Sequence, residues 1–218
     1  MDRGTDRLPP RSAAAVAGNA PGQAIRKALL AIAVVLAIAF LLIGGSRWPN
    51  GGWMHESIEW AGLILIGLCI LGRMWCTMYI GGRKNRALVT VGPYSVSRNP
   101  LYVFSIIGAV GVGAQVGSLL AALVCGFIVW AIFLWTALRE EAALSAAFAN
   151  SYHLYVERVP RFLPKFSLWQ APATLVVEPR FILATFFDAL VFLIAIPLAE
   201  GLEYLHDIGS LPAYLLVP

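Results

Sequence analysis

The longest stretch without a charged residue is the feature that most constrains the fold of this chain. Forty consecutive residues, between Arg98 and Arg139, contain no Asp, Glu, Lys or Arg. A helix needs about 20 apolar residues to cross a bilayer, so this stretch is long enough for two crossings. Two helices joined by a turn would return both ends of the stretch to one membrane face. The sequence therefore predicts an antiparallel membrane hairpin with polar residues at its open end.

Composition extends this prediction to the whole chain. Of its 218 residues, 59% are hydrophobic and only 13% are charged, whereas a soluble domain carries about 25% charged residues. The net charge of +4 is small and gathers in loops, which indicates membrane topology rather than nucleic-acid binding. The three cysteines and three histidines lack ligand spacing, so no metal site is expected and the cysteines are predicted to be small buried side chains.

Apolar runs predict an all-α integral membrane protein with about five transmembrane helices. The five runs are residues 28–45, 60–80, 101–112, 119–138 and 181–199. Residues 1–24 are interpreted as a disordered basic tail and residues 25–218 as a single membrane domain. Arg73 and Asp188 are charged and lie deep within predicted spans, so we expect them to form an ion pair or, as the alternative, to line a cavity open to lipid.

A surface helix is expected after the hairpin. Leu144, Phe148, Tyr152 and Tyr155 recur at helical spacing within residues 140–158, with polar residues between them. This pattern is typical of an amphipathic helix at a membrane surface. Lysines and arginines gather in the tail, before the hairpin and after it, so the positive-inside rule predicts a cytoplasmic amino terminus and a cytoplasmic hairpin opening. In a bacterium the membrane would be the inner one.

The start of the hairpin carries the first candidate site residues. Asn99 followed by Pro100 suits the first turn of a helix, and a simple helix start is one interpretation. That interpretation does not explain Arg98 or Tyr102, which would share a helix face. The alternative is a binding site at this membrane face.

The end of the hairpin carries two acids, Glu140 and Glu141. The helix dipole at a carboxyl end favours cations, so carboxylates there need a cationic partner. That partner is either an arginine of the chain, such as Arg98 or Arg139, or the cationic group of a ligand. A shared-proton pair is not expected, because adjacent helical residues point to different faces.

The order of these motifs resembles the isoprenylcysteine carboxyl methyltransferase family, to which phospholipid methyltransferases are related. The motifs L-V-T-x-G-P-Y and R-N-P-x-Y precede the uncharged hairpin. E-E, F-x-x-x-Y-x-x-Y and V-P-x-x-L-P follow it, and the resemblance covers residues 79–164. It implies an integral membrane enzyme that transfers the methyl group of S-adenosylmethionine without a metal. The implied partners are the bilayer and a lipophilic or prenylated substrate, not a nucleic acid.

Site residues follow from the resemblance by position. Glu140 would hold the ammonium group of the cofactor, which a carboxylate suits. The other cofactor contacts that the resemblance implies are Tyr79, Arg86, Ala87, Leu88, Val89, Tyr94, Asn99, Pro100, Leu101 and Tyr102. Tyrosine rings can stack on adenine or approach a sulfonium, and an arginine can pair with the cofactor carboxylate. The residues expected to serve catalysis are Arg98, Glu141 and Arg139.

Three positions depart from the family pattern. Asn99 replaces a histidine, which removes a titratable ring and excludes general-base chemistry by this residue. Arg86 replaces another frequent histidine, and Thr136 stands where the carboxyl methyltransferases place a substrate arginine. Because a carboxylate acceptor is already ionised at neutral pH and needs no base, O-methylation of a lipidic or prenylcysteine-type carboxylate is favoured. The alternatives are amine, phospholipid or thiol methylation, a sterol-reductase-like enzyme that uses a nicotinamide, and a membrane protein without activity.

Overall fold

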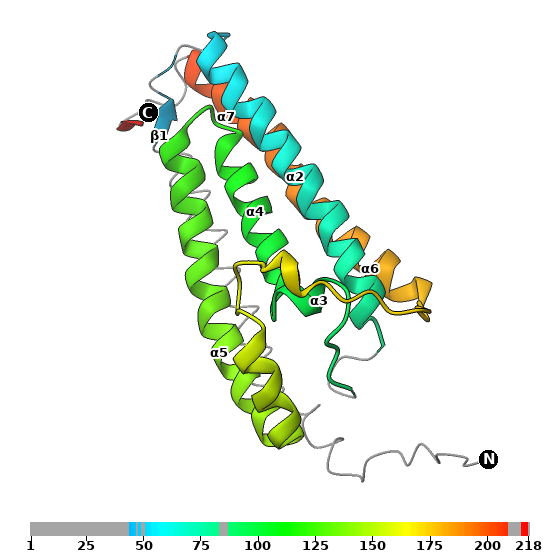
Figure 1. Cartoon of the computed structure of the whole chain (residues 1–218). Coiled ribbons are helices and arrows are strands. Elements are labelled where there is room, and N and C mark those ends of the chain that lie inside the picture. Colours follow the sequence, from blue (N-terminus) through cyan, green and yellow to red (C-terminus); the bar gives the residue numbers. More distant parts are fainter. Residues whose placement is uncertain (1–43, 47, 49–50, 83–86, 209–214, 218) are drawn as a thin grey trace, which may run out of the picture.

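The computed structural model describes residues 44–46, 48, 51–82, 87–208 and 215–217, which form a bundle of long helices (Figure 1). The predicted tail and nearly all of the predicted first span lie outside the described residues. The helices are α2 (Trp53–Ile80), α3 (Pro93–Val96), α4 (Pro100–Ala114), α5 (Leu119–Arg158), α6 (Pro179–Ala189) and α7 (Ala195–Asp207), with 3-10 turns η3 (Phe166–Leu168) and η4 (Leu190–Ile194). Two short strands, β1 (Gly44–Ser46) and β2 (Leu215–Val217), pair in parallel.

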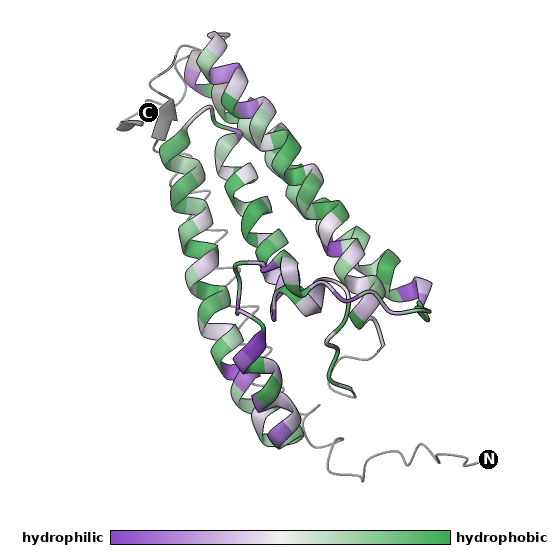
Figure 2. Cartoon of the chain, viewed as in Figure 1, coloured by the Kyte–Doolittle hydropathy of each residue, from purple (hydrophilic) through white to green (hydrophobic). Residues whose placement is uncertain are grey.

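The described residues confirm a helical membrane architecture. Three segments are long and apolar enough to cross a bilayer, Trp53–Ile80, Leu119–Arg158 and Pro179–His206, and α4 is a shorter apolar helix. Apolar residues cover most of the length of these helices, and polar residues gather at the far end of α5 (Figure 2). The total of five spans stays a prediction.

Small residues bring α2 and α4 close together. A methyl group added at Gly111 would lie 2.7 Å from the carbonyl oxygen of Gly62, and one added at Gly108 would lie 2.5 Å from Sγ of Cys69. Such contacts let membrane helices pack backbone against backbone. The helix α2 begins at Trp53, whereas the apolar run predicted a start at residue 60. The run missed the first two turns because they carry polar residues. All three cysteines are buried, as predicted.

The predicted hairpin consists of α4 and α5. Gly117, with a φ of +63°, lies in the connecting turn, and the Ser118 side chain accepts a hydrogen bond from the backbone N–H of Ala121 at 3.2 Å. This bond caps the first turn of α5. At 15 residues, α4 rises roughly 22 Å at about 1.5 Å per residue. It is therefore shorter than the ~30 Å hydrocarbon core.

The helix α5 continues past the predicted end of its span and then turns back. Ala149 has φ 43° and ψ −118°, which breaks the helical backbone, and the chain after it folds back along the helix (Figure 1). The residues of the predicted amphipathic stripe face each other across this kink. Tyr152 and Tyr155 are buried in a cluster with Leu144 and Phe148. The stripe thus packs against the protein, and residues 140–148 prolong the preceding span.

The expected ion pair between Arg73 and Asp188 is wrong. The Arg73 guanidinium donates a hydrogen bond to the hydroxyl of Ser105 on α4. Among the described residues no ion pair joins it to Asp188 on α6. Sequence gives the depth of a charge in a helix but not the direction in which it points, and the close α2–α4 contact supplies a nearer partner.

Candidate active site

Eleven residues after α5 tie the start of α4 in place. We call residues 160–170 the strap. Its carbonyl oxygens accept hydrogen bonds from the N–H of Arg98 at 2.9 Å, of Asn99 at 3.1 Å and of Gly92 at 2.8 Å. The N–H of Lys165 donates to the carbonyl of Val96 at 2.9 Å. Because these bonds satisfy backbone groups on both segments, they fix the conformation that leads into the hairpin.

Asn99 contributes to this arrangement in an unexpected way. It occupies the cap position of α4, and Pro100 follows as the first helical residue, as predicted. Its side chain does not cap the helix, however. Nδ2 of Asn99 donates to the carbonyl oxygen of Arg161 at 3.3 Å, and the Ser97 hydroxyl donates to that of Phe162 at 3.0 Å. The asparagine therefore attaches the helix start to the strap.

The two ends of the hairpin meet at Tyr102 and Glu140. The Tyr102 hydroxyl donates a hydrogen bond to Oε2 of Glu140 at 2.8 Å. One face of the tyrosine ring stacks on Phe133, with centroids 4.5 Å apart and planes 12° apart. These two residues, 38 positions apart in sequence, are brought together by the hairpin. A hydrogen bond to a carboxylate is stronger than one between neutral groups, so this contact also orients Glu140.

Glu141 stands between two arginines. Arg161 forms a bidentate pair with it, with Nε 3.0 Å from Oε1 and Nη2 2.9 Å from Oε2, and Nη2 of Arg98 lies 3.5 Å from Oε1. Hydrogen bonding to Glu141 raises the pKa of Arg161. The Arg98 side chain is only 9% exposed, and its Nε and Nη1 are buried without a hydrogen-bond partner among the described residues. A buried guanidinium with two unused donors is suited to hold an anion.

The short helix α3 carries a buried tyrosine, and tyrosines from α2 and α5 pack nearby. Tyr94 is buried, and burial is the main cause of a pKa well above the usual tyrosine value; Glu140 is among the groups that raise it. Tyr155 donates its hydroxyl to the Tyr94 carbonyl at 2.7 Å. Tyr79 packs on Gly92, where a methyl group would lie 2.2 Å from the ring. Gly92 has a φ of +61°, so both space and backbone conformation require glycine there.

The remaining predicted residues are placed as follows. Arg139 is exposed and its guanidinium lies 4.0 Å from the centroid of the Trp135 ring, so the structure turns it away from Glu141. Arg86 lies outside the described residues. Ala87 is exposed, Val89 is partly buried, and Leu88 packs against the Tyr152 and Tyr155 cluster. Pro100 is buried, and Leu101 packs beside Tyr102 and Phe133.

Sequence reasoning missed the part that the strap plays. Arg161 was counted only as a topological charge, although it lies inside the V-P-x-x-L-P motif and is a main partner of Glu141. Tyr155 was assigned to an amphipathic stripe, although it binds the backbone of Tyr94. Thr136 is buried and donates its hydroxyl to the Ile132 carbonyl of its own helix at 2.8 Å.

The residues present fit S-adenosylmethionine. The cofactor carries an ammonium, a carboxylate, a sulfonium and a flat adenine. Glu140 is a carboxylate, Arg98 has two buried and unused donors, and Tyr94 and Tyr102 are aromatic. Among the described residues no group of three or more His, Cys, Asp or Glu could hold a metal ion.

Comparison of the sequence with known proteins shows the family of this chain. Residues 60–151 match the model of the phospholipid methyltransferases. The cobalt-zinc-cadmium resistance protein CzcN of Cupriavidus metallidurans is 35% identical over 84% of this chain and 83% of its own length. The nickel-cobalt-cadmium resistance protein NccN of Alcaligenes xylosoxydans xylosoxydans is 30% identical over 86% of this chain and 87% of its own length.

A further relative links the chain to the resemblance found in the sequence. The protein-S-isoprenylcysteine O-methyltransferase of Schizosaccharomyces pombe is 35% identical over 37% of this chain and 34% of its own length. This chain belongs to the membrane methyltransferase family shared by the phospholipid and isoprenylcysteine carboxyl methyltransferases. No solved structure is significantly similar to it.

Proposed function

We propose that this protein is an integral membrane methyltransferase that uses S-adenosylmethionine to O-methylate a carboxylate of a lipidic or prenylcysteine-type substrate. The contact between Tyr102 and Glu140 is the observation that carries the proposal. It joins the R-N-P-x-Y and E-E motifs at one end of the hairpin, beside the buried cation of Arg98. Family membership supports methyl transfer, and the cofactor and the acceptor are the proposed part.

The chain's own residues account for cofactor binding. Glu140 holds the ammonium group, and the unused donors of Arg98 hold the carboxylate. S-adenosylmethionine supplies a methyl group on a positively charged sulfur when it is bound. Buried tyrosine rings exclude water and place π faces near that charge, which favours both binding and in-line positioning. Tyr102 donates to one oxygen of Glu140, and a carboxylate can accept further hydrogen bonds, so an ammonium group can bind while Tyr102 orients the side chain.

The state of Glu141 favours a carboxylate acceptor. An amine or thiol acceptor must lose a proton, which requires a base with an available lone pair. Both oxygens of Glu141 are engaged by Arg98 and Arg161, so neither is free to approach an acceptor. Asn99 cannot titrate. An acceptor that is ionised at neutral pH avoids this requirement.

Helix lengths favour a site at the membrane surface. From Leu119 to Ala149, α5 rises roughly 45 Å at about 1.5 Å per residue. The hydrocarbon core is about 30 Å thick, so the part of α5 with the two acids extends beyond it. A lipophilic acceptor could reach the site from the bilayer while the cofactor arrives from water. The positive-inside rule assigns this face to the cytoplasm.

The decisive test compares Glu140→Ala with Glu157→Ala. Glu157 is an exposed carboxylate on the same helix and is the matched control. Loss of the ammonium contact should weaken binding of S-adenosylmethionine by more than tenfold in calorimetry of the purified protein, at unchanged thermal stability. Unchanged affinity in Glu140→Ala would remove the site assignment. Tight binding of NADPH instead would favour a reductase.

The acceptor is tested by the chemistry of the product. Membranes that contain the protein are incubated with S-adenosylmethionine labelled in the methyl group, with Glu140→Ala as the control. An ester releases volatile methanol in mild base, whereas N-methyl and S-methyl products keep the label. We expect base-labile label in the lipid-soluble fraction, and base-stable label would replace the carboxylate with an amine or thiol.

Similarity to CzcN and NccN favours heavy-metal resistance as the biological setting. Those names describe the relatives, and we extend them to this chain only as a proposal. A strain that lacks the gene should become more sensitive to cobalt, zinc or cadmium, and the wild-type gene should restore growth. If Glu140→Ala restores growth equally well, resistance does not depend on methyl transfer.

A further inference from the structure

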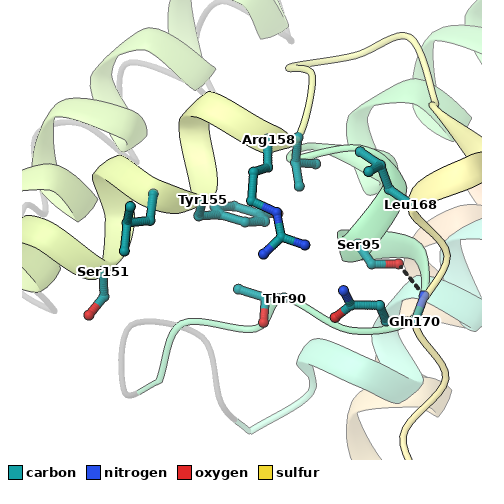
Figure 3. Close-up of a pocket in the computed structure, with 9 residues that line it drawn as sticks. Thr90, Ser95, Ser151, Tyr155, Arg158, Leu168 and Gln170 are labelled. Carbon is teal, nitrogen blue, oxygen red and sulfur yellow. Dashed lines mark hydrogen bonds between the residues drawn. The ribbon is translucent and has the colours of Figure 1, made fainter.

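A second pocket is lined by residues around α3, and Glu140 is not among its lining residues. Its volume is about 160 Å³, and its lining includes Thr90, Ser95, Tyr155, Arg158, Leu168 and Gln170. These residues come from the loop before α3, from α3 itself, from the last turns of α5 and from the strap (Figure 3). None of them is among the residues that the sequence assigned to cofactor or catalysis.

Arg158 gives the pocket its charge. Its guanidinium points into the space above Thr90 and Gln170 (Figure 3). No carboxylate in the part of the chain that the structure describes pairs with it. The side chains of Thr90 and Gln170 make no hydrogen bond to described residues either, whereas Ser95 already donates to the Gly92 carbonyl at 2.6 Å. Three side chains with unused donors therefore converge on one space, which is suited to an anion.

Exposed apolar side chains lie on the pocket wall and along the strap, and we call this set the rim. Leu154 is 56% exposed on the pocket wall, and Leu163 and Phe166 of the strap are 84% and 73% exposed. Trp169, beside Leu168 and Gln170, stacks on Trp75 of α2 with centroids 5.6 Å apart. This places the strap at the level where α2 ends. Aromatic and aliphatic residues beside arginines at the end of a membrane helix are typical of the bilayer interface.

We propose that this pocket binds the anionic head group of a membrane lipid, through a phosphate or carboxylate held by Arg158, Thr90 and Gln170. Pockets for whole drug-sized molecules measure about 300–1,000 Å³, so this smaller pocket takes only a head group. The acyl chains lie outside it, along the exposed strap. Arg158 is exposed, and a lipid head group would cover it from water. This would strengthen the attraction between its guanidinium and the anion. This proposal is independent of methyl transfer, since none of its three residues belongs to the Glu140 site.

Binding of defined lipids to the purified full chain tests the proposal. Native mass spectrometry compares phosphatidylglycerol with phosphatidylcholine in the wild type, in Arg158→Gln and in Lys165→Gln. Lys165 is an exposed strap cation outside the pocket, so its variant controls for general attraction of the surface to anionic lipid. We expect at least a tenfold preference for phosphatidylglycerol in the wild type and Lys165→Gln, and loss of most of that preference in Arg158→Gln. Equal losses in both variants would overturn the proposal.

Two further measurements separate the possible sources of the anion. Soluble glycerol phosphate should bind at least tenfold more weakly than phosphatidylglycerol, because it lacks the acyl chains that contact the rim. Equal binding would overturn the lipid as the ligand. Affinity of Arg158→Gln for S-adenosylmethionine should stay within twofold of the wild type. A large loss would assign the pocket to the cofactor and overturn the proposal, whatever the result for Glu140→Ala.

Discussion

The two ends of the α4–α5 hairpin use buried polar residues in different ways. At the turn, Nε2 of Gln115 donates to the backbone carbonyl of Glu59 at 3.1 Å, and Ser118 caps α5. At the open end, Glu140 and Glu141 meet Tyr102, Arg98 and Arg161. At the turn, neutral side chains thus form hydrogen bonds with backbone groups. At the open end, charged side chains contact each other.

This is the difference that we expect between an end that only holds the fold together and an end that binds a ligand. A neutral side chain that bonds a backbone group stabilises the fold at little desolvation cost. Buried charges are expensive, and donors left unused, such as Nε and Nη1 of Arg98, add to that cost. We propose that the chain retains these groups to bind a ligand. Variants at the two ends should therefore affect stability and cofactor affinity differently.

Glu141→Gln should produce the largest loss of stability. It leaves Arg98 and Arg161 without their carboxylate, and Arg98 is nearly buried. The expected loss is about 2 kcal/mol, between the values for exposed and buried pairs. Thermal unfolding in detergent measures it, with Glu157→Gln as the exposed control. A loss no greater than that of the control would show that the open end is not held by its ion pairs.

Gln115→Ala sharpens the comparison from the other end. Removal of one hydrogen bond to the Glu59 carbonyl should cost about 1 kcal/mol of stability. Affinity for S-adenosylmethionine should stay within twofold, because the turn lies at the opposite end of the hairpin. Ser57→Ala, which removes an exposed side-chain bond to the Trp53 carbonyl, serves as the control. A tenfold fall in affinity would show that the two ends are coupled.

Ala149→Gly should give the smallest effect, and it should stabilise. Ala149 has φ 43°, a conformation that glycine adopts more readily than alanine. We expect a gain of about 0.5 kcal/mol, within the range for relief of such strain. The matched control is Ala147→Gly, two residues earlier in regular helix, which should lose about 1 kcal/mol. The same sign for both variants would contradict the kink.

The hairpin and the contact between Tyr102 and Glu140 could be predicted from the sequence. Forty uncharged residues in a membrane protein leave few other paths, and Ser118 and Gly117 mark the turn. Side-chain direction was harder to predict. Arg139 was expected to contribute to the site, but it stacks on Trp135, one helical turn earlier, while Glu141 faces Arg98 and Arg161.

The kink and the strap could not be predicted, for two physical reasons. Ala149 is a strong helix former with no glycine or proline beside it, and Asn150 and Ser151 favour turns too weakly to locate the reversal. The strap acts mainly through the carbonyl oxygens of residues such as Pro160 and Arg161. Every residue type carries such an oxygen, so a motif search cannot recognise this role.

The strap also sets the order in which the protein can mature. Gln170 is the last strap residue that bonds the segment before α4. Its carbonyl oxygen accepts from the N–H of Gly92, and its N–H donates to the hydroxyl oxygen of Ser95. During synthesis the hairpin can insert long before residue 170 leaves the ribosome. Until then the nascent chain lacks the backbone partners that fix Gly92, Arg98 and Asn99. We therefore expect that the shortest translation product able to bind S-adenosylmethionine extends to residue 170, well past the family match that ends at residue 151.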